Sequence, residues 1–280
     1  MTPEPKRGIG ILDSGVGGLS VLRHVMALLP HENLIYFADQ AHVPYGPRPA
    51  REIQQFSAEI TRFLLDQGSK LIVVACNTAS AASLTYLRKN FPGTPFVGME
   101  PAVKPGAVNS QKGRIGVLAT EGTFGSPRYA KLLARYAQGV ISFEDPCPGL
   151  VEQIEGGQLS GSETERILHQ AIDPMIAAGV DTLILGCTHY PFVLPLIGKV
   201  AGPEVTIIDP APAVARQVER LLQQHDLQGP ATVSGSVIAY TTGNPDKLAD
   251  LSERLLDFSF PVLGTCWDES GRLQPFPVDS

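Results

Sequence analysis

The feature that most constrains the fold is an internal repeat. Four short stretches of the first half of the chain recur in the same order in the second half. The pairs are IGILDSG from Ile9 with IGVLATEG from Ile115, IYFAD from Ile35 with ISFED from Ile141, DQGSKLIVVACNT from Asp66 with AAGVDTLILGCTH from Ala177, and EPAV from Glu100 with APAV from Ala211. The offset is 106 residues for the first two pairs and 111 for the last two. We infer a duplicated unit with a few extra residues in its second copy.

Apolar runs of strand length alternate with segments of helical periodicity. The predicted strands are Gly8–Leu12, Leu34–Ala38, Leu71–Ala75, Phe96–Gly98, Ile115–Ala119, Val140–Phe143, Thr182–Gly186 and Thr206–Ile208. The predicted helices are Leu19–Leu29, Ile53–Gln67, Ala79–Asn90, Arg128–Tyr136, Thr164–Ala178, Ala213–Gln224 and Lys247–Leu256. This alternation predicts an α/β fold, with two similar parallel-sheet domains related by pseudo-twofold symmetry and a site in the cleft between them. The FSFPVLG stretch is expected to pack back on the first domain, and the residues from Cys266 to form a loose tail.

Composition narrows the class of function. A net charge of −6 and a pI of about 5.5 argue against a dedicated nucleic-acid binder, so a small-molecule ligand is expected. The N-terminal residues lack the apolar core of a signal peptide, and the uncharged windows 71–87 and 182–198 are interrupted by polar residues or prolines. We therefore expect a cytoplasmic protein with no membrane span. The four cysteines form no C-x-x-C pair, so no metal site is predicted.

Two of the cysteines, Cys76 and Cys187, occupy equivalent places in the repeat, directly after a predicted strand. A thiol at the start of a helix is close to free backbone N–H groups, which favour the thiolate and lower its pKa. Unpaired cysteines are usually buried for packing, and Cys147 and Cys266 keep that interpretation. The equivalence of Cys76 and Cys187 instead indicates a pair of reactive thiols. Helix caps at Asn77, Thr78 and Thr188 could hold an anion nearby.

Other motifs surround this pair. Asp13 and Ser14 end the first predicted strand before GVGG, which matches the dinucleotide fingerprint G-x-G-x-x-G only in part; the glycines are also explained by a tight turn, and Asp13 by a cap or turn role. The loop DQAHVPYGPRP carries Tyr45 and Gly46, which could border a site or form a plain surface turn. His189 follows Cys187 closely enough to modulate its thiol.

Taken together, DSGVGG, PYG, ACNT and GCTHYP resemble the glutamate racemase family over about residues 8 to 260. The resemblance implies a cofactor-independent enzyme that interconverts L- and D-glutamate for peptidoglycan synthesis, commonly as a homodimer. It implies two domains with the second inserted in the first, here residues 1–103 plus 213–280, carrying Cys76, and residues 104–212, carrying Cys187.

Residue roles follow from the same resemblance. Cys76 would take the proton from D-glutamate and Cys187 from L-glutamate. Substrate binding or tuning of the thiols would fall to Asp13, Ser14, Tyr45, Gly46, Asn77, Thr78, Thr120, Thr188 and His189. A glutamate near the second thiol is placed by spacing at Glu155, with Glu152 close by.

Three alternatives stay open at this point. The chain could racemise aspartate or another acid, it could be an NAD-dependent enzyme that uses GVGG, or it could be a two-domain binding protein without catalytic activity. No sequence context singles out a lysine for pyridoxal phosphate, and no cofactor is expected.

Overall fold

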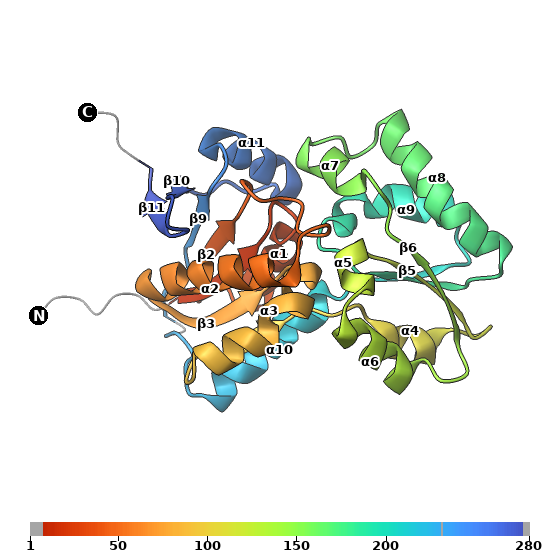
Figure 1. Ribbon diagram of the computed structural model, residues 1–280, viewed down its shortest axis with the longest axis horizontal. Coiled ribbons are helices and arrows are strands. Elements are labelled where there is room, and N and C mark those ends of the chain that lie inside the picture. The colour runs from red at the N-terminus through yellow and green to blue at the C-terminus, as the bar shows by residue number, and fades with distance from the viewer. Residues whose placement is uncertain (1–7, 231, 277–280) are drawn as a thin grey trace, which may run out of the picture.

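The computed structural model describes residues 8–230 and 232–276, which form two lobes, each built around a sheet (Figure 1). The strands are β1 Gly8–Asp13, β2 Asn33–Ala38, β3 Ser69–Val74, β4 Phe96–Gly98, β5 Arg114–Leu118, β6 Ile141–Asp145, β7 Thr182–Leu185, β8 Thr206–Ile208, β9 Val237–Thr241, β10 Val262–Trp267 and β11 Leu273–Pro275. The helices are α1 Leu19–Leu28, α2 Ala50–Asp66, α3 Asn77–Asn90, α4 Val103–Asn109, α5 Glu121–Phe124, α6 Pro127–Tyr136, α7 Leu150–Glu155, α8 Ser162–Ala177, the 3-10 helix η1 Tyr190–Val193, α9 Leu194–Ala201, α10 Ala211–Gln224 and α11 Pro245–Leu256.

The duplication is visible in the order of the strands. The first sheet contains the order β2-β1-β3-β4, and the second sheet has the order β6-β5-β7-β8. All pairings within these two sets are parallel. Each strand of the first set therefore has a counterpart at the same place in the second, and the predicted α/β fold with two similar parallel sheets is confirmed. All the strands expected from the sequence are present, with ends that differ from the prediction by at most two residues.

Helices cover both faces of the first sheet because its strands are apolar on both sides. In β3, Leu71 and Val73 pack on the face covered by α1 and α10, whereas Ile72 and Val74 pack on the face covered by α2 and α3. Alternating side chains point to opposite faces of a strand, so an unbroken apolar run requires cover on both. Truncating a fully buried side chain such as Val73 to alanine is expected to cost about 2 kcal/mol.

The C-terminal stretch extends the first sheet beyond β2. Strand β9 pairs in parallel with β2, β10 pairs with β9, and β11 pairs antiparallel with β10. The expected packing of FSFPVLG against the first lobe is thus confirmed. The prediction of a loose tail from Cys266 is wrong for residues 266–276, and its last part, 277–280, lies outside the described residues. Cys266 and Trp267 belong to β10, and the indole Nε1 of Trp267 donates a 2.8 Å hydrogen bond to the buried Asp39 carboxylate. Paired backbone and this buried contact hold the segment in place.

No helix in the described ranges is both long and apolar enough to cross a membrane.

Candidate active site

Both cysteines of the repeat lie just beyond the carboxyl end of a strand. Cys76 follows β3 and is the N-cap of α3, while Cys187 follows β7 and precedes the short helix η1. Each side chain is 6% exposed. Since β3 and β7 are counterparts in the two sheets, the two thiols come from equivalent points of the two lobes.

The two thiols line one cavity. It is lined by Ser14, Pro44, Tyr45, Gly46, Cys76, Asn77, Thr78, Thr120, Val151, Cys187, Thr188 and His189. Of the residues singled out in the sequence, Asp13 and Glu155 are the two that do not line it; both lie behind it. Pro44 and Val151 were not singled out, although Pro44 belongs to the PYG motif. The cavity is narrow, with room for about one water molecule, so an amino acid can enter only if the walls move apart.

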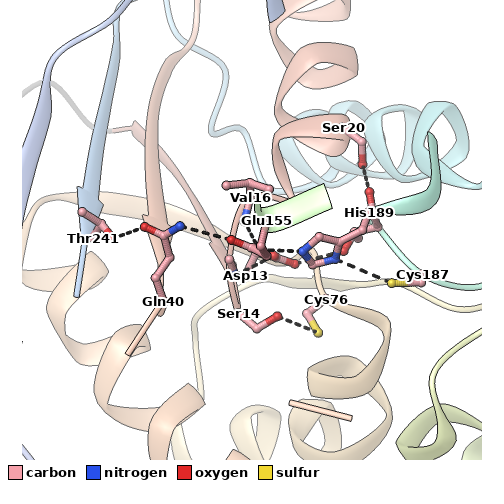
Figure 2. Close-up of polar contacts among 12 residues, drawn as sticks. Asp13, Ser14, Val16, Ser20, Gln40, Cys76, Glu155, Cys187, His189 and Thr241 are labelled. Atoms are coloured by element: carbon pink, nitrogen blue, oxygen red, sulfur yellow. Dashed lines mark hydrogen bonds and ion pairs between the residues drawn. The ribbon is translucent and has the colours of Figure 1, made fainter. Parts of the chain in front are cut away.

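The Cys187 thiol is next to a histidine and a carboxylate. Its Sγ is 3.6 Å from His189 Nδ1, and His189 Nε2 is 2.7 Å from Glu155 Oε1 (Figure 2). Burial opposes a charge on His189, but its hydrogen bonds to Cys187 and Glu155 outweigh burial and raise the imidazole pKa well above 6.5. The environment therefore favours an imidazolium between a sulfur and a carboxylate.

Glu155, at the end of α7, bridges the two lobes. Its Oε1 accepts a 2.7 Å hydrogen bond from the backbone N–H of Val16, and its Oε2 accepts a 3.1 Å bond from Gln40 Nε2 (Figure 2). Burial raises the pKa of this carboxyl, but the hydrogen bond and charge of His189 and the two first-lobe donors bring it below 4.5. Glu152, the nearby alternative, is exposed on the same helix.

Cys76 has different neighbours. Its sulfur accepts hydrogen bonds from the Ala79 N–H, at 3.4 Å, and from Ser14 Oγ, at 3.9 Å. Burial and the negative charge of Asp13 nevertheless raise the pKa of the Cys76 thiol to about 12. The expectation that the helix N-terminus lowers this pKa is therefore wrong, because loss of solvation outweighs the gain from one backbone donor.

Asp13 is fully buried beneath the cavity. One of its oxygens accepts the Gly15 N–H at 2.9 Å, and the other accepts the hydroxyl of Thr188 at 3.3 Å. Burial raises the pKa of this carboxyl above 3.8. Thr188, expected as a helix cap, thus contacts Asp13 of the other lobe; Asn77 and Thr78 lie in the first turn of α3, which Cys76 itself caps.

The glycines of GVGG make room for the second lobe. A methyl group added to Gly15 would overlap Glu155 Oε1, and one added to Gly17 would overlap Thr188 Oγ1 and His189 Nδ1. The side chains of the second lobe occupy the space directly above this loop. In this arrangement the loop has no room for a dinucleotide pyrophosphate, and the close approach of these side chains explains both glycines.

Polar groups on the opposite wall remain available for a ligand. Both side-chain atoms of the buried Asn77 lack a hydrogen-bond partner, although a buried unpaired amide is costly. Thr78 Oγ1 and Thr120 Oγ1, one from each lobe, are 2.7 Å apart. Gly46 approaches the Thr120 side chain, and the Tyr45 hydroxyl donates a 2.7 Å hydrogen bond to Asp39. An incoming carboxylate could take these donors.

Within the described residues, no group of three or more His, Cys, Asp or Glu side chains is arranged to hold a metal ion.

Comparisons with known proteins agree with this geometry. Residues 10–218 match the family described as Asp/Glu/Hydantoin racemase. A glutamate racemase from Roseiflexus sp. (strain RS-1) is 47% identical over 256 residues, which are 91% of this chain and 94% of the relative. The crystal structure of a glutamate racemase from Bacillus anthracis has a TM-score of 0.85 at 34% identity, covering 95% of this chain and 99% of the other. That of Francisella tularensis subsp. tularensis SCHU S4, in complex with D-glutamate, has a TM-score of 0.80 at 31% identity, covering 92% and 97%.

Proposed function

Because the chain belongs to the Asp/Glu/Hydantoin racemase family, we propose that it interconverts L-glutamate and D-glutamate without a cofactor. The observation that carries the proposal is the shared cavity: two buried cysteines from equivalent points of a duplicated unit line it together. Relatives named glutamate racemase match most of the chain, and the Francisella relative binds D-glutamate.

The proposed reaction exchanges one proton on each face of the α-carbon. One thiolate removes the α-proton, which leaves a carbanion, and the thiol on the opposite face donates its proton to that carbon. The substrate is inverted, and the two sulfurs have exchanged protonation states. Matched acid and base groups suit a reaction whose substrate and product are mirror images.

Hydrogen-bond donors around the cavity are proposed to hold the substrate and stabilise the carbanion. The unpaired Asn77 amide and the hydroxyls of Ser14 and Thr78, which line the cavity, would bind carboxylate oxygens. Closing a narrow cavity around the substrate excludes water, and donors fixed in a dry site stabilise developing charge more than water does. Thr188 and Asp13 then support these groups from behind.

The surroundings of the thiols support an assignment of roles. Cys187 is beside a histidine whose imidazolium form is favoured, whereas Cys76 is held as the thiol by burial and Asp13. We propose that the free enzyme rests with Cys187 as thiolate and Cys76 as thiol. Cys187 then removes the proton from L-glutamate and Cys76 that from D-glutamate.

The family resemblance supports three further parts of the proposal. D-glutamate would supply peptidoglycan synthesis, the protein would act in the cytoplasm, and it would form a homodimer. Light scattering of the purified protein tests the last of these, since a monomeric mass at working concentration would contradict it.

The decisive experiment is racemisation in heavy water with no cofactor added. Starting from L-glutamate, the first D-glutamate formed should carry deuterium at the α-carbon, while the remaining L-glutamate stays mostly protiated. Equal early labelling of both isomers would indicate one shared base and overturn the two-thiol mechanism. Turnover of aspartate but not of glutamate would support a racemase of aspartate or another acid. Tight binding of a nicotinamide cofactor would support an NAD-dependent enzyme. Ligand binding without α-proton exchange would support a binding protein without catalytic activity.

A further inference from the structure

A continuous chain of hydrogen bonds connects the carboxyl end of β9, in the first sheet, to Cys187. The backbone N–H of Gly243 donates to Thr241 Oγ1 at 2.9 Å, and Thr241 Oγ1 donates to Gln40 Oε1 at 2.9 Å. Gln40 Nε2 donates to Glu155 Oε2, and the other oxygen of Glu155 is paired with His189, which contacts the Cys187 sulfur. Figure 2 shows these side chains in a row from Thr241 to Cys187. We refer to Thr241, Gln40, Glu155 and His189 as the relay.

We propose that Gln40 and Thr241 are positioning residues that orient Glu155 and thereby hold the charged pair of His189 and Cys187. This inference rests on the proposed function, in which Cys187 is one of the two proton-transferring thiols. Neither residue touches the cavity, and neither belongs to the motifs that carry the family resemblance.

The donors and acceptors of the relay fix the orientation of the Gln40 side-chain amide. Thr241 Oγ1 accepts from a backbone N–H that can only donate, so its own proton is free for Gln40 Oε1. Gln40 must then present its NH₂ group to Glu155. The reversed amide would place its oxygen against a carboxylate and its NH₂ against the Thr241 hydroxyl, which loses the hydrogen bond to Glu155.

The relay also crosses between the lobes. Gln40 and Thr241 belong to the first lobe, and Glu155 and His189 to the second (Figure 2). The narrow cavity must open to admit a substrate, and separation of the lobes would break the bonds from Gln40 and Val16 to Glu155. Glu155 therefore accepts all of its hydrogen bonds only while the two lobes are closed together.

Titratable groups face the pair of His189 and Cys187 from both lobes. Cys76, Cys147 and Tyr190 are close enough to Cys187 for its charge to act on them. Glu155 and Cys187 contact His189 directly, Asp13 acts on both His189 and Glu155 through its charge, and Tyr36 lies close enough to Asp13 and Glu155 to be affected by them. Gln40 is neutral, so it stabilises the Glu155 carboxylate by hydrogen bonding and not by charge. Loss of that bond should make the charged form of Glu155 less stable. The imidazolium of His189, and with it the thiolate of Cys187, would then be less stabilised.

The test measures the Cys187 thiolate directly by its ultraviolet absorbance as a function of pH. The difference between Cys76→Ser protein and Cys76→Ser/Cys187→Ser protein isolates this one thiol and requires no racemase activity. Adding Gln40→Ala should shift the proton equilibrium of this thiol toward the protonated form, because Glu155 then stabilises the imidazolium of His189 less. Thr241→Val should shift it in the same direction by less.

Two variants separate positioning from simple packing. Gln40→Glu keeps the shape but turns an acceptor toward Glu155, so it should shift the titration at least as far as Gln40→Ala; Thr241→Ser keeps the hydroxyl and should restore the parent value. Gln54→Ala is the matched control, because Gln54 donates to the Ala82 carbonyl outside the relay.

In otherwise unmutated protein, Gln40→Ala should lower kcat for L-glutamate severalfold with little change in KM. An unshifted titration in Gln40→Glu would overturn the inference even if racemisation is confirmed. A shifted titration in a protein without racemase activity would retain the relay and reject the proposed function.

Discussion

Cys76 and Cys187 are counterparts in a duplicated unit, but the side chains around them are not. At the end of the first strand, Asp13 of the first copy corresponds to Ala119 of the second. Two residues after the cysteine, Thr78 in the first copy corresponds to His189 in the second. At these two positions of the repeat, the first copy therefore has an ionisable group only at the strand end, and the second copy only after the cysteine.

The difference separates what backbone geometry provides from what side chains provide. The parallel strands bring both thiols to one cavity, whereas the side chains differ: Asp13 raises the pKa of Cys76, and the imidazolium form of His189 is favoured beside Cys187. A mirror-image reaction does not require mirror-image surroundings, because each thiol needs only the correct proton at the correct time. The asymmetry favours one resting state, and the following predictions test it.

The largest expected effect comes from removing either thiol. Cys76→Ser and Cys187→Ser should each reduce racemisation in both directions by about 10³-fold to 10⁴-fold, since a hydroxyl is a far poorer acid or base at neutral pH. A coupled assay for each direction measures the loss, and circular dichroism checks the fold. Cys266→Ser, on strand β10 and away from the cavity, is the control and should retain activity. A single variant with near-parent activity would show that the thiols are not a working pair.

The Glu155–His189 pair should make stability depend on pH. The pKa of Glu155 is below 4.5 in the folded protein, so its contribution is present above 4.5 and is lost as pH falls through the folded value. The pKa of His189 is raised above 6.5, so its contribution is complete below 6.5 and is lost as pH rises through the folded value. Removing one partner of a buried pair leaves the other uncompensated, so Glu155→Gln should cost about 2–4 kcal/mol of unfolding free energy between these limits.

Urea unfolding at acid and neutral pH measures this change. The difference between Glu155→Gln and parent protein should shrink in acid, where the parent carboxyl is protonated. Glu152→Gln, on the exposed side of the same helix, is the matched control and should change stability little. Equal effects of the two substitutions would mean that the interlobe contacts of Glu155 contribute nothing.

The pKa of Cys76 should change in opposite directions when its two polar neighbours, Asp13 and Ser14, are replaced. Asp13→Asn removes a negative charge and should lower the Cys76 pKa from about 12 by about one unit, a tenfold change in the proton equilibrium. Ser14→Ala removes a hydrogen bond that favours the thiolate and should raise it. Thiolate absorbance in the Cys187→Ser background measures both shifts. Shifts of the same sign would show that packing changes, and not charge and hydrogen bonding, control this thiol.

The part of the fold that carries the repeat could be predicted from the sequence. Strands buried on both faces are apolar throughout, and self-alignment related β1 to β5 and β3 to β7. Strands β9, β10 and β11 were missed, because they have no counterpart in the second copy and are stabilised by pairing with one another and with β2. Short sequence patterns do not predict strands that depend on such distant partners.

The residues of the candidate site also fall into those that local motifs predict and those that depend on contacts between distant segments. The residues around Cys76 and Cys187 stand in short motifs at strand ends, so their proximity could be expected, and their roles remain predictions. Gln40 and Thr241 carried no signal, because their only connection to the site is through contacts between distant segments. The direction of the Cys76 pKa shift was also missed, since burial depends on the closed arrangement of both lobes.

The smallest predicted effect tests the C-terminal strand that the sequence did not reveal. Trp267→Phe removes one of several hydrogen bonds to Asp39, which also accepts from Tyr45, His42 and Thr242. The expected cost is about 1 kcal/mol, which corresponds to about 2–4 °C in Tm for a chain of this size. Cys266→Ser serves again as the control, because it changes the neighbouring residue of β10 without touching Asp39. If Trp267→Phe left Tm at the control value, the remaining donors would satisfy Asp39, and the indole hydrogen bond would contribute nothing to holding β10 on the first lobe.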